Sequence, residues 1–158
     1  MEQTNLILLV CSTYLRDSQT SQISVRSPYL TEDKLSGEGF HPGVDIANAK
    51  GTPIPAPVSG TITNVVTGKK QGDNGYGNSV TVKDTGGNQH KLSHLDNVFV
   101  RPGDRVQAGR PTGTMGNSGS TYSQGGQGDG THLDYRIVSA YGRYMNPMSY
   151  HKFFMKKR

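Results

Sequence analysis

Three short stretches of the sequence carry histidine and aspartate at spacings that suit metal or proton chemistry. The first is the run 41–45, in which three residues separate His41 from Asp45. In an extended chain, residues an even number of positions apart share a face, so these two side chains can converge on one ion. Imidazole and carboxylate together are suitable zinc ligands. On the spacing alone, however, a solvated pair of loop residues is the better explanation.

The second stretch is the run 91–95, which contains His94. Its alternation predicts a strand with Leu92 and His94 on one face and with Ser93 and Leu95 on the other. A single strand histidine is most often half-buried and hydrogen-bonded. His94 therefore indicates a site only in combination with other residues.

The third stretch is the run 132–138, which reads as a strand entered from a glycine-rich loop. Alternation places its apolar residues on the core face: Leu133, Tyr135 and Ile137. The opposite face then carries three ionisable residues: His132, Asp134 and Arg136. This pattern is typical of the edge of a site. The alternative is a solvent-facing β surface with an Asp134–Arg136 pair that contributes little stability.

The elements that would position these residues are short strands separated by turns. The chain has 158 residues and 21 glycines, about twice the usual share of glycine. Runs rich in β-branched residues end at Gly, Pro, Asn or Asp, and the turn 84–87 joins two of them into a hairpin. The sequence therefore predicts a mostly antiparallel β domain. The glycines of 116–130 are expected to form a flexible wall beside the last strand.

Composition excludes several classes of protein and site. The single cysteine, Cys11, excludes an intrachain disulfide framework and a zinc site built from several thiolates. No apolar run approaches the roughly 18 residues of a membrane span, and the apolar run 6–10 lacks the basic flank of a secretory signal. The net charge of +5 suits a polyanionic partner, but no aromatic-basic strand motif supports nucleic-acid binding. The run 84–86 matches the tripeptide of aspartic proteases, yet it lies at a hairpin turn, where Asp and Gly are ordinary.

The order and surroundings of these motifs resemble the M23 family of peptidoglycan metallopeptidases, also called the LytM or lysostaphin type. The segment around His41 and Asp45 looks like that family's His-x3-Asp signature, and the segment around His94 fits its histidine box. The remaining matching segments are 51–60, 102–109, 113–119 and 130–134. The resemblance covers about residues 23–150 and implies an antiparallel LytM/lysostaphin-like sheet with long glycine-rich loops around a groove.

The resemblance implies a role for each motif residue. His41 and Asp45 resemble the first two ligands of a Zn²⁺ ion. His132 resembles the catalytic first histidine of the family's His-x-His box, and His94 resembles its catalytic partner. The second histidine of that box is the third ligand in the family, and here Asp134 stands in its place.

Two interpretations of this departure remain open. Carboxylate oxygen binds zinc at about the same distance as imidazole nitrogen, so Asp134 can serve as the third ligand of an altered site. The family also usually has Glu two residues further on, whereas this chain has Arg136. If Arg136 binds Asp134, the metal site loses its third ligand and the domain is degenerate.

The sequence thus predicts a zinc-dependent endopeptidase that hydrolyses stem or cross-bridge peptides of bacterial peptidoglycan. The alternative is a degenerate module that binds cell wall or a partner protein. We expect residues 1–22 to be an extension, 23–150 the peptidase domain and 151–158 a basic tail. His90 and His151 are expected to be ordinary surface histidines. We expect an extracellular or virion-associated protein, with other phage tail or lysis proteins as partners besides peptidoglycan.

Overall fold

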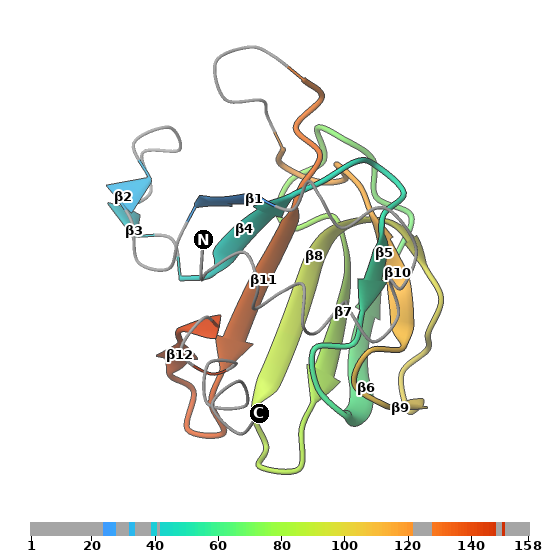
Figure 1. The fold of residues 1–158 in the computed structure, drawn as a ribbon, viewed down its shortest axis with the longest axis vertical. Coiled ribbons are helices and arrows are strands. Elements are labelled where there is room, and N and C mark those ends of the chain that lie inside the picture. Colours follow the sequence, from blue (N-terminus) through green and yellow to red (C-terminus); the bar gives the residue numbers. More distant parts are fainter. Residues whose placement is uncertain are drawn as a thin grey trace.

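Strand β8 (Gln89–Val98) is central to the fold because three other strands pair with it. β11 (Leu133–Val138) lies along one side, β7 (Asn78–Lys83) along the other, and β10 (Pro111–Met115) pairs with its far end. Figure 1 shows β11, β8 and β7 side by side. Every one of these pairings is antiparallel, so the predicted antiparallel β fold is confirmed.

The structure is a computed structural model that describes residues 24–27, 32–33, 39–40, 42–121, 128–147 and 150. Both predicted terminal segments, 1–22 and 151–158, lie outside these described residues, as do Cys11 and His151. The predicted division of the chain therefore stays a prediction. None of the helical segments in the described ranges has the length and apolar character needed to span a membrane.

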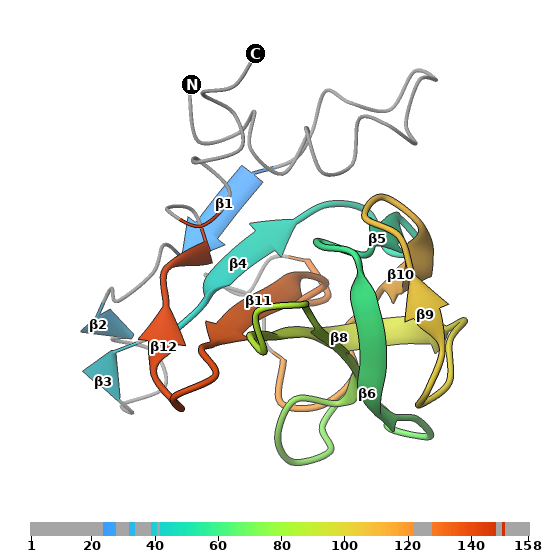
Figure 2. The same cartoon turned by 90° about the horizontal axis from the view of Figure 1, so that it is seen from below.

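The main sheet has ten strands, in the order β1-β4-β11-β8-β7-β6-β9, with β10, β5 and β12 joined at its sides. Seen from below, β12 lies at one flank and β9 at the other (Figure 2). The other strands of this sheet are β1 (Ser24–Ser27), β4 (Val44–Ala47), β5 (Pro53–Pro55), β6 (Gly60–Val66), β9 (Arg105–Val106) and β12 (Tyr144–Met145). A separate pair consists of β2 (Glu32–Asp33) and β3 (Gly39–Phe40).

One face of the central strands forms the apolar core, as the alternation in 132–138 predicts. All three apolar residues of β11 are buried: Leu133, Tyr135 and Ile137. They pack with apolar side chains of the neighbouring strands, among them Val44, Val80 and Leu92. The opposite face of β11 is thereby left to its ionisable residues.

The hairpin β7–β8 ends in a buried polar network that the sequence did not predict. His90 is fully buried, so the expectation that it is a surface histidine is wrong. Its Nδ1 lies 2.8 Å from the Tyr135 hydroxyl, and its Nε2 lies 3.0 Å from Oδ2 of Asp84. The Tyr150 hydroxyl donates to the same Asp84 oxygen at 2.8 Å. These four residues, here called the closed cluster, fix the hairpin turn to β11 and to the C-terminal part of the domain.

The closed cluster shifts the pKa of its members. Burial raises the pKa of Asp84, but hydrogen bonds from His90, Tyr150 and Asn88 outweigh burial and lower it to about 2. Burial lowers the pKa of His90, and Asp84 opposes that shift. Burial and the neighbouring Asp84 raise the pKa of Tyr150 to about 12. The carboxylate of Asp84 is therefore stabilised in its charged form by the fold.

Candidate functional site

Two aspartates face each other where β4 and β11 pair. Asp45 on β4 and Asp134 on β11 are direct Cα partners in the antiparallel register. On its other side, Asp134 is the partner of Ser93 on β8. Asp134 is buried, and Asp45 is half-buried. Like charges directly opposite one another on adjacent strands are destabilising, so the carboxylates need a positive group nearby.

Arg136 supplies that positive group to Asp134. Its Nε donates to both carboxylate oxygens, at 3.0 Å to Oδ1 and 3.1 Å to Oδ2. Its Nη2 donates to Oδ2 at 2.8 Å. Burial lowers the pKa of Arg136, but the hydrogen bond and charge of Asp134 outweigh burial and raise it. Both oxygens of Asp134 are thus bound by one guanidinium group, the geometry in which Arg–carboxylate pairs are strongest.

Gly43 makes room for this ion pair. A Cβ atom at Gly43 would lie 2.6 Å from Cγ of Arg136 and 2.9 Å from Oδ1 of Asp134. Both distances are shorter than a real Cβ contact allows. The glycine between His41 and Asp45 therefore lets the backbone before β4 pass directly over the Asp134–Arg136 pair.

His132 lies just before β11 and faces Asp45. Its Nδ1 is 2.7 Å from the carbonyl oxygen of Gly130, which can only accept, so Nδ1 carries a proton. Its Nε2 lies 3.9 Å from Oδ1 of Asp45. Nε2 of His132 is therefore directed toward a carboxylate, an arrangement that a proton or a cation between them would stabilise.

His94 is held against His132 by an unusual backbone conformation. Its φ of 64° makes it the only non-glycine residue with positive φ in the described part of the chain. The two imidazole rings lie 4.7 Å apart between centroids. Nδ1 of His94 is 2.7 Å from the Ser118 carbonyl oxygen, and its backbone N–H donates to the Tyr76 carbonyl at 2.9 Å. Such a conformation costs about 1–2 kcal/mol and is typical of functional sites.

The same conformation interrupts the alternation that the sequence predicts for β8. Leu92 lies in the apolar core, whereas His94, predicted on the same face, contacts His132. Ser93 and Leu95 are also buried. Burial lowers the pKa of His94, and the neighbouring His132 lowers it further, against opposing effects of Ser118, Asp134 and Asp45. His94 therefore favours the neutral form.

The structure describes two of the three predicted zinc ligands, Asp45 and Asp134. Of the three predicted ligands, His41 lies outside the described residues, Asp45 faces His132, and Asp134 is bound by Arg136. Within the described ranges, no group of three His, Cys, Asp or Glu side chains is placed to hold a metal ion. The structure brings Asp45, His94, His132 and Asp134 to one place, but their roles stay predictions.

Tyr76 also lies beside these residues, although no sequence motif predicted it as a site residue. Its hydroxyl accepts a hydrogen bond from Nη1 of Arg136 at 2.8 Å, and its ring lies under two cations. Nζ of Lys91 is 3.9 Å and Cζ of Arg136 is 4.6 Å from the ring centroid. The only signal in the sequence is an aromatic residue between two glycines, Gly75 and Gly77, in a polar loop.

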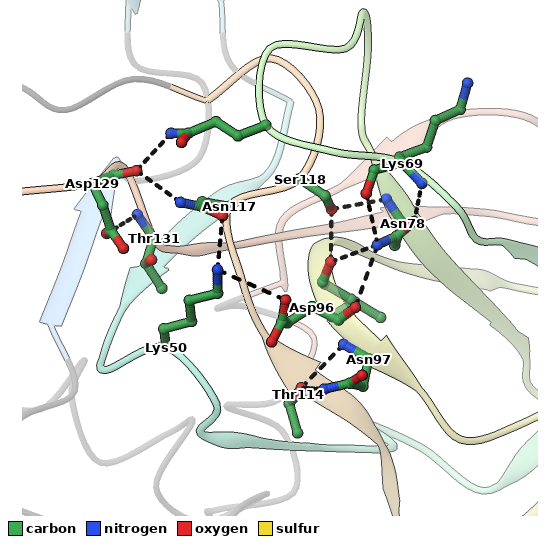
Figure 3. Close-up of polar contacts among 12 residues, drawn as sticks. Lys50, Lys69, Asn78, Asp96, Asn97, Thr114, Asn117, Ser118, Asp129 and Thr131 are labelled. Carbon is green, nitrogen blue, oxygen red and sulfur yellow. Dashed lines mark hydrogen bonds and ion pairs between the residues drawn. The ribbon is translucent and has the colours of Figure 1, made fainter.

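Two loops next to the site are fastened to each other and to β8. Ser118 is central, because its Oγ accepts from the backbone N–H of Asn78 at 2.9 Å and donates to the Leu95 carbonyl at 2.6 Å. Figure 3 shows this network together with the contacts of Asn117 and Lys50. Residue 119 also bridges to Gln71. The part of the predicted flexible wall up to residue 121 is therefore tied down, while residues 122–127 lie outside the described residues.

Glycines allow the two loops to touch. A Cβ atom at Gly77 would collide with the backbone of Ser118, and one at Gly119 would collide with the backbone of Gly77. Both glycines also have positive φ, 65° and 82°, which disfavours other residues. The wall beside His94 is thus built by direct backbone contact.

Comparison with known proteins places this chain in a family. A model of peptidase family M23 matches residues 39–147. The murein hydrolase activator NlpD of Salmonella typhimurium is 29% identical over 121 residues, which cover 77% of this chain but only 29% of NlpD. The chain therefore spans less than a third of that relative.

Solved structures of M23 proteins are also similar to this chain. The catalytic domain of prophage-encoded M23 protein EnpA from Enterococcus faecalis, solved as a point mutant, is 29% identical with a TM-score of 0.63, covering 80% of this chain and 90% of that one. The catalytic domain of the antimicrobial peptidase lysostaphin from Staphylococcus simulans is 27% identical with a TM-score of 0.63, covering 83% and 92%. With the family model matching more than half of its length, the chain belongs to peptidase family M23.

Proposed function

We propose that this chain is a peptidoglycan-binding M23 module in which the Asp134–Arg136 ion pair takes the place of the metal centre. The observation that carries the proposal is the binding of both Asp134 oxygens by one guanidinium group. A carboxylate engaged in this way already has its negative charge matched by a cation of the protein. Asp134 is then not available as the third ligand that the resemblance implies, although Asp45 and His132 lie close to it.

The energetics favour keeping the ion pair. Recruiting Asp134 to zinc would leave the guanidinium of Arg136 mostly buried, with its side chain only 13% exposed and no carboxylate bound to it. Breaking a buried ion pair by removing one partner costs about 3–5 kcal/mol. The positive charge of Arg136 would also repel a divalent cation placed at Asp134.

The similarity to one relative, NlpD, supports a function without hydrolysis. NlpD, similar over 77% of this chain, is by its name an activator of murein hydrolases. The fastened loops beside His94 form a rigid wall, which lowers the entropy cost of ordering a bound peptide. Peptidoglycan peptides are the ligands that the family membership supports.

A second candidate is the zinc-dependent endopeptidase that the sequence predicts, cutting stem or cross-bridge peptides of peptidoglycan. The specific observation in its favour is the contact between the rings of His94 and His132, with Nε2 of His132 directed at Asp45. A binding module has no evident need for two histidines held in this way, one of them in a strained conformation.

Zinc content separates the two candidates. We expect the full chain to sediment with purified peptidoglycan, to carry no stoichiometric zinc and to release no new amino termini. The double variant Asp134→His/Arg136→Glu, which restores the family pattern, should take up zinc. The same variant with His41→Ala is the matched control, and it should lose the ion if His41 is a ligand. Stoichiometric zinc in the unmodified chain, with amino termini released only in the absence of a chelator, would overturn the first candidate and support the second.

For the biological setting we propose a phage protein that acts outside the bacterial membrane, with other tail or lysis proteins as partners. The support is the similarity to the prophage-encoded protein EnpA and the location of peptidoglycan itself. Mass spectrometry of purified virions and of the lysate from a phage that encodes the chain would test this setting. Absence of the chain from both would contradict it.

A further inference from the structure

Next to the ion pair, two cations lie side by side on neighbouring strands. Lys91 on β8 and Arg136 on β11 are direct Cα partners, and both contact the ring of Tyr76. Like charges opposite each other on adjacent strands are unfavourable unless an anion lies between them or nearby. Lys91 belongs to none of the candidate sites that the sequence motifs indicate.

Lys91, Arg136 and Asp134 together carry two positive charges and one negative charge. The carboxylate of Asp134 is engaged by Arg136 at both oxygens. Lys91 forms an ion pair with no carboxylate in the described part of the chain. Its ammonium lies on the face of Tyr76 and its side chain is half-buried. One positive charge, the ammonium of Lys91, therefore lies beside Tyr76 without a carboxylate paired to it among the described residues.

Tyr76 adds a neutral donor next to this charge. Its hydroxyl oxygen accepts the hydrogen bond from Nη1 of Arg136, so its own proton is available to a further acceptor. The residue is 39% exposed, so a ligand can reach it. An ammonium and a hydroxyl that both donate suit a group with two acceptor oxygens and a negative charge, which is a carboxylate.

The position of this group relative to the histidines sets the length of the ligand. Along their strands, Lys91 lies three residues from His94 and Arg136 lies four residues from His132, a distance of roughly 10–13 Å. An extended peptide covers that distance in about three or four residues. A peptide whose terminal carboxylate lies at Lys91 would therefore place the bond about three residues before its end beside His94 and His132.

We propose that Lys91 and Tyr76, positioned by Arg136, form a subsite for the terminal carboxylate of a peptidoglycan stem peptide. This inference rests on the proposed function, because it assumes that peptidoglycan peptides occupy the groove. It adds that the groove recognises the free end of a peptide in preference to an internal segment.

The test compares two forms of one peptide. Diacetyl-Lys-D-Ala-D-Ala and its C-terminal amide differ only in the terminal charge, and both are titrated into the full chain by calorimetry or by NMR. A charge-assisted contact of this kind corresponds to at least about tenfold in affinity. We expect the acid to bind at least about tenfold more tightly than the amide. Equal binding of the two forms by the unmodified chain would overturn the subsite.

Two lysine variants test whether Lys91 causes the preference for the acid form of the peptide. Lys91→Met keeps the length of the side chain and removes its charge, and it should reduce the preference for the acid to less than about twofold. Lys83→Met is the matched control, because Lys83 is an exposed lysine on the neighbouring strand β7, and this variant should keep the preference. Thermal unfolding of both variants verifies that they fold. A preference that survives in Lys91→Met would place the carboxylate elsewhere.

Sedimentation with purified peptidoglycan distinguishes failure of the proposed function from failure of the subsite. A chain that does not sediment with peptidoglycan would contradict the proposed function and, with it, the subsite. If the chain sediments but binds the acid and amide equally, only the subsite is wrong.

Discussion

Strand β11 contributes to two polar clusters, one on each of its faces, and the two clusters differ in their access to solvent. On the core face lies the closed cluster of Asp84, His90, Tyr135 and Tyr150, in which His90 is fully buried. On the opposite face lies the open cluster, which we define as Asp45, His94, His132, Asp134, Arg136 and Tyr76. Both clusters combine carboxylate, imidazole and phenol, so residue type alone does not separate a structural network from a binding site.

The difference lies in where the polar atoms are directed. In the closed cluster, both nitrogens of His90 are hydrogen-bonded within the protein. In the open cluster, Nδ1 of each histidine is hydrogen-bonded to a backbone carbonyl, and Nε2 of His132 faces Asp45. A fully satisfied network stabilises one conformation, whereas groups oriented by the backbone are prepared for a ligand.

The largest effect on stability is expected from the open cluster, at Arg136. Arg136→Met leaves the buried carboxylate of Asp134 without its cation and should lower the free energy of unfolding by about 3 kcal/mol. The double variant Asp134→Asn/Arg136→Met removes both charges and should recover most of that loss. Urea unfolding of both variants measures the effect. A change below about 0.5 kcal/mol in the single variant would mean that the ion pair behaves as an exposed one.

The closed cluster should give a smaller effect that depends on pH. The pKa of Asp84 is about 2 in the folded protein, against an ordinary value of 3.8, so folding favours its charged form. Its contribution, about 2 kcal/mol, is present above about pH 4 and is lost as the pH falls toward 2. Urea unfolding between pH 2 and pH 7 should show a loss of stability in the unmodified chain that is about 2 kcal/mol smaller in Asp84→Asn.

Asp96→Asn serves as the control for Asp84→Asn. Asp96 is an exposed aspartate that lies 3.8 Å from Lys50, and such pairs contribute little. The control should keep the acid dependence of the unmodified chain. If Asp84→Asn also keeps it, the stabilised carboxylate is not that of Asp84.

The smallest effect concerns the backbone at His94. Glycine adopts a φ of 64° without strain, whereas alanine does not, so His94→Gly should be about 1 kcal/mol more stable than His94→Ala. At Ser93, on the neighbouring position of β8, the order should reverse, because glycine is unfavourable in an ordinary strand. Thermal unfolding of the four variants tests both statements. Equal stability of His94→Ala and His94→Gly would contradict a strained backbone at position 94.

The sequence predicts the sheet well where periodicity is undisturbed. In β11 the alternation identifies Leu133, Tyr135 and Ile137 as core residues and Asp134 as facing the site. The hairpin turn was also predicted, because Asp and Gly are turn residues by their own conformational preferences. These features depend on neighbours along the chain.

The remaining features depend on contacts between segments distant in the sequence. His90 is buried because Tyr135 and Tyr150, 45 and 60 residues later, complete its surroundings together with Asp84. The alternation fails at His94 because Tyr76 and Ser118 hold it in a conformation that no local pattern indicates. Whether Asp134 pairs with Arg136 was left open by the sequence, because either role fits the same strand face.

The backbone contact between Gly77 and Gly119 has a consequence for engineering. Specificity in a domain of this kind is commonly altered by exchanging one surface loop for that of a relative. Here the two loops are a single interlocking part, since any side chain at either glycine would meet the backbone of the other loop. A graft of residues 67–77 alone would therefore misplace the carbonyl of Ser118 that orients His94. Successful chimaeras should be those that carry both loops from the same parent.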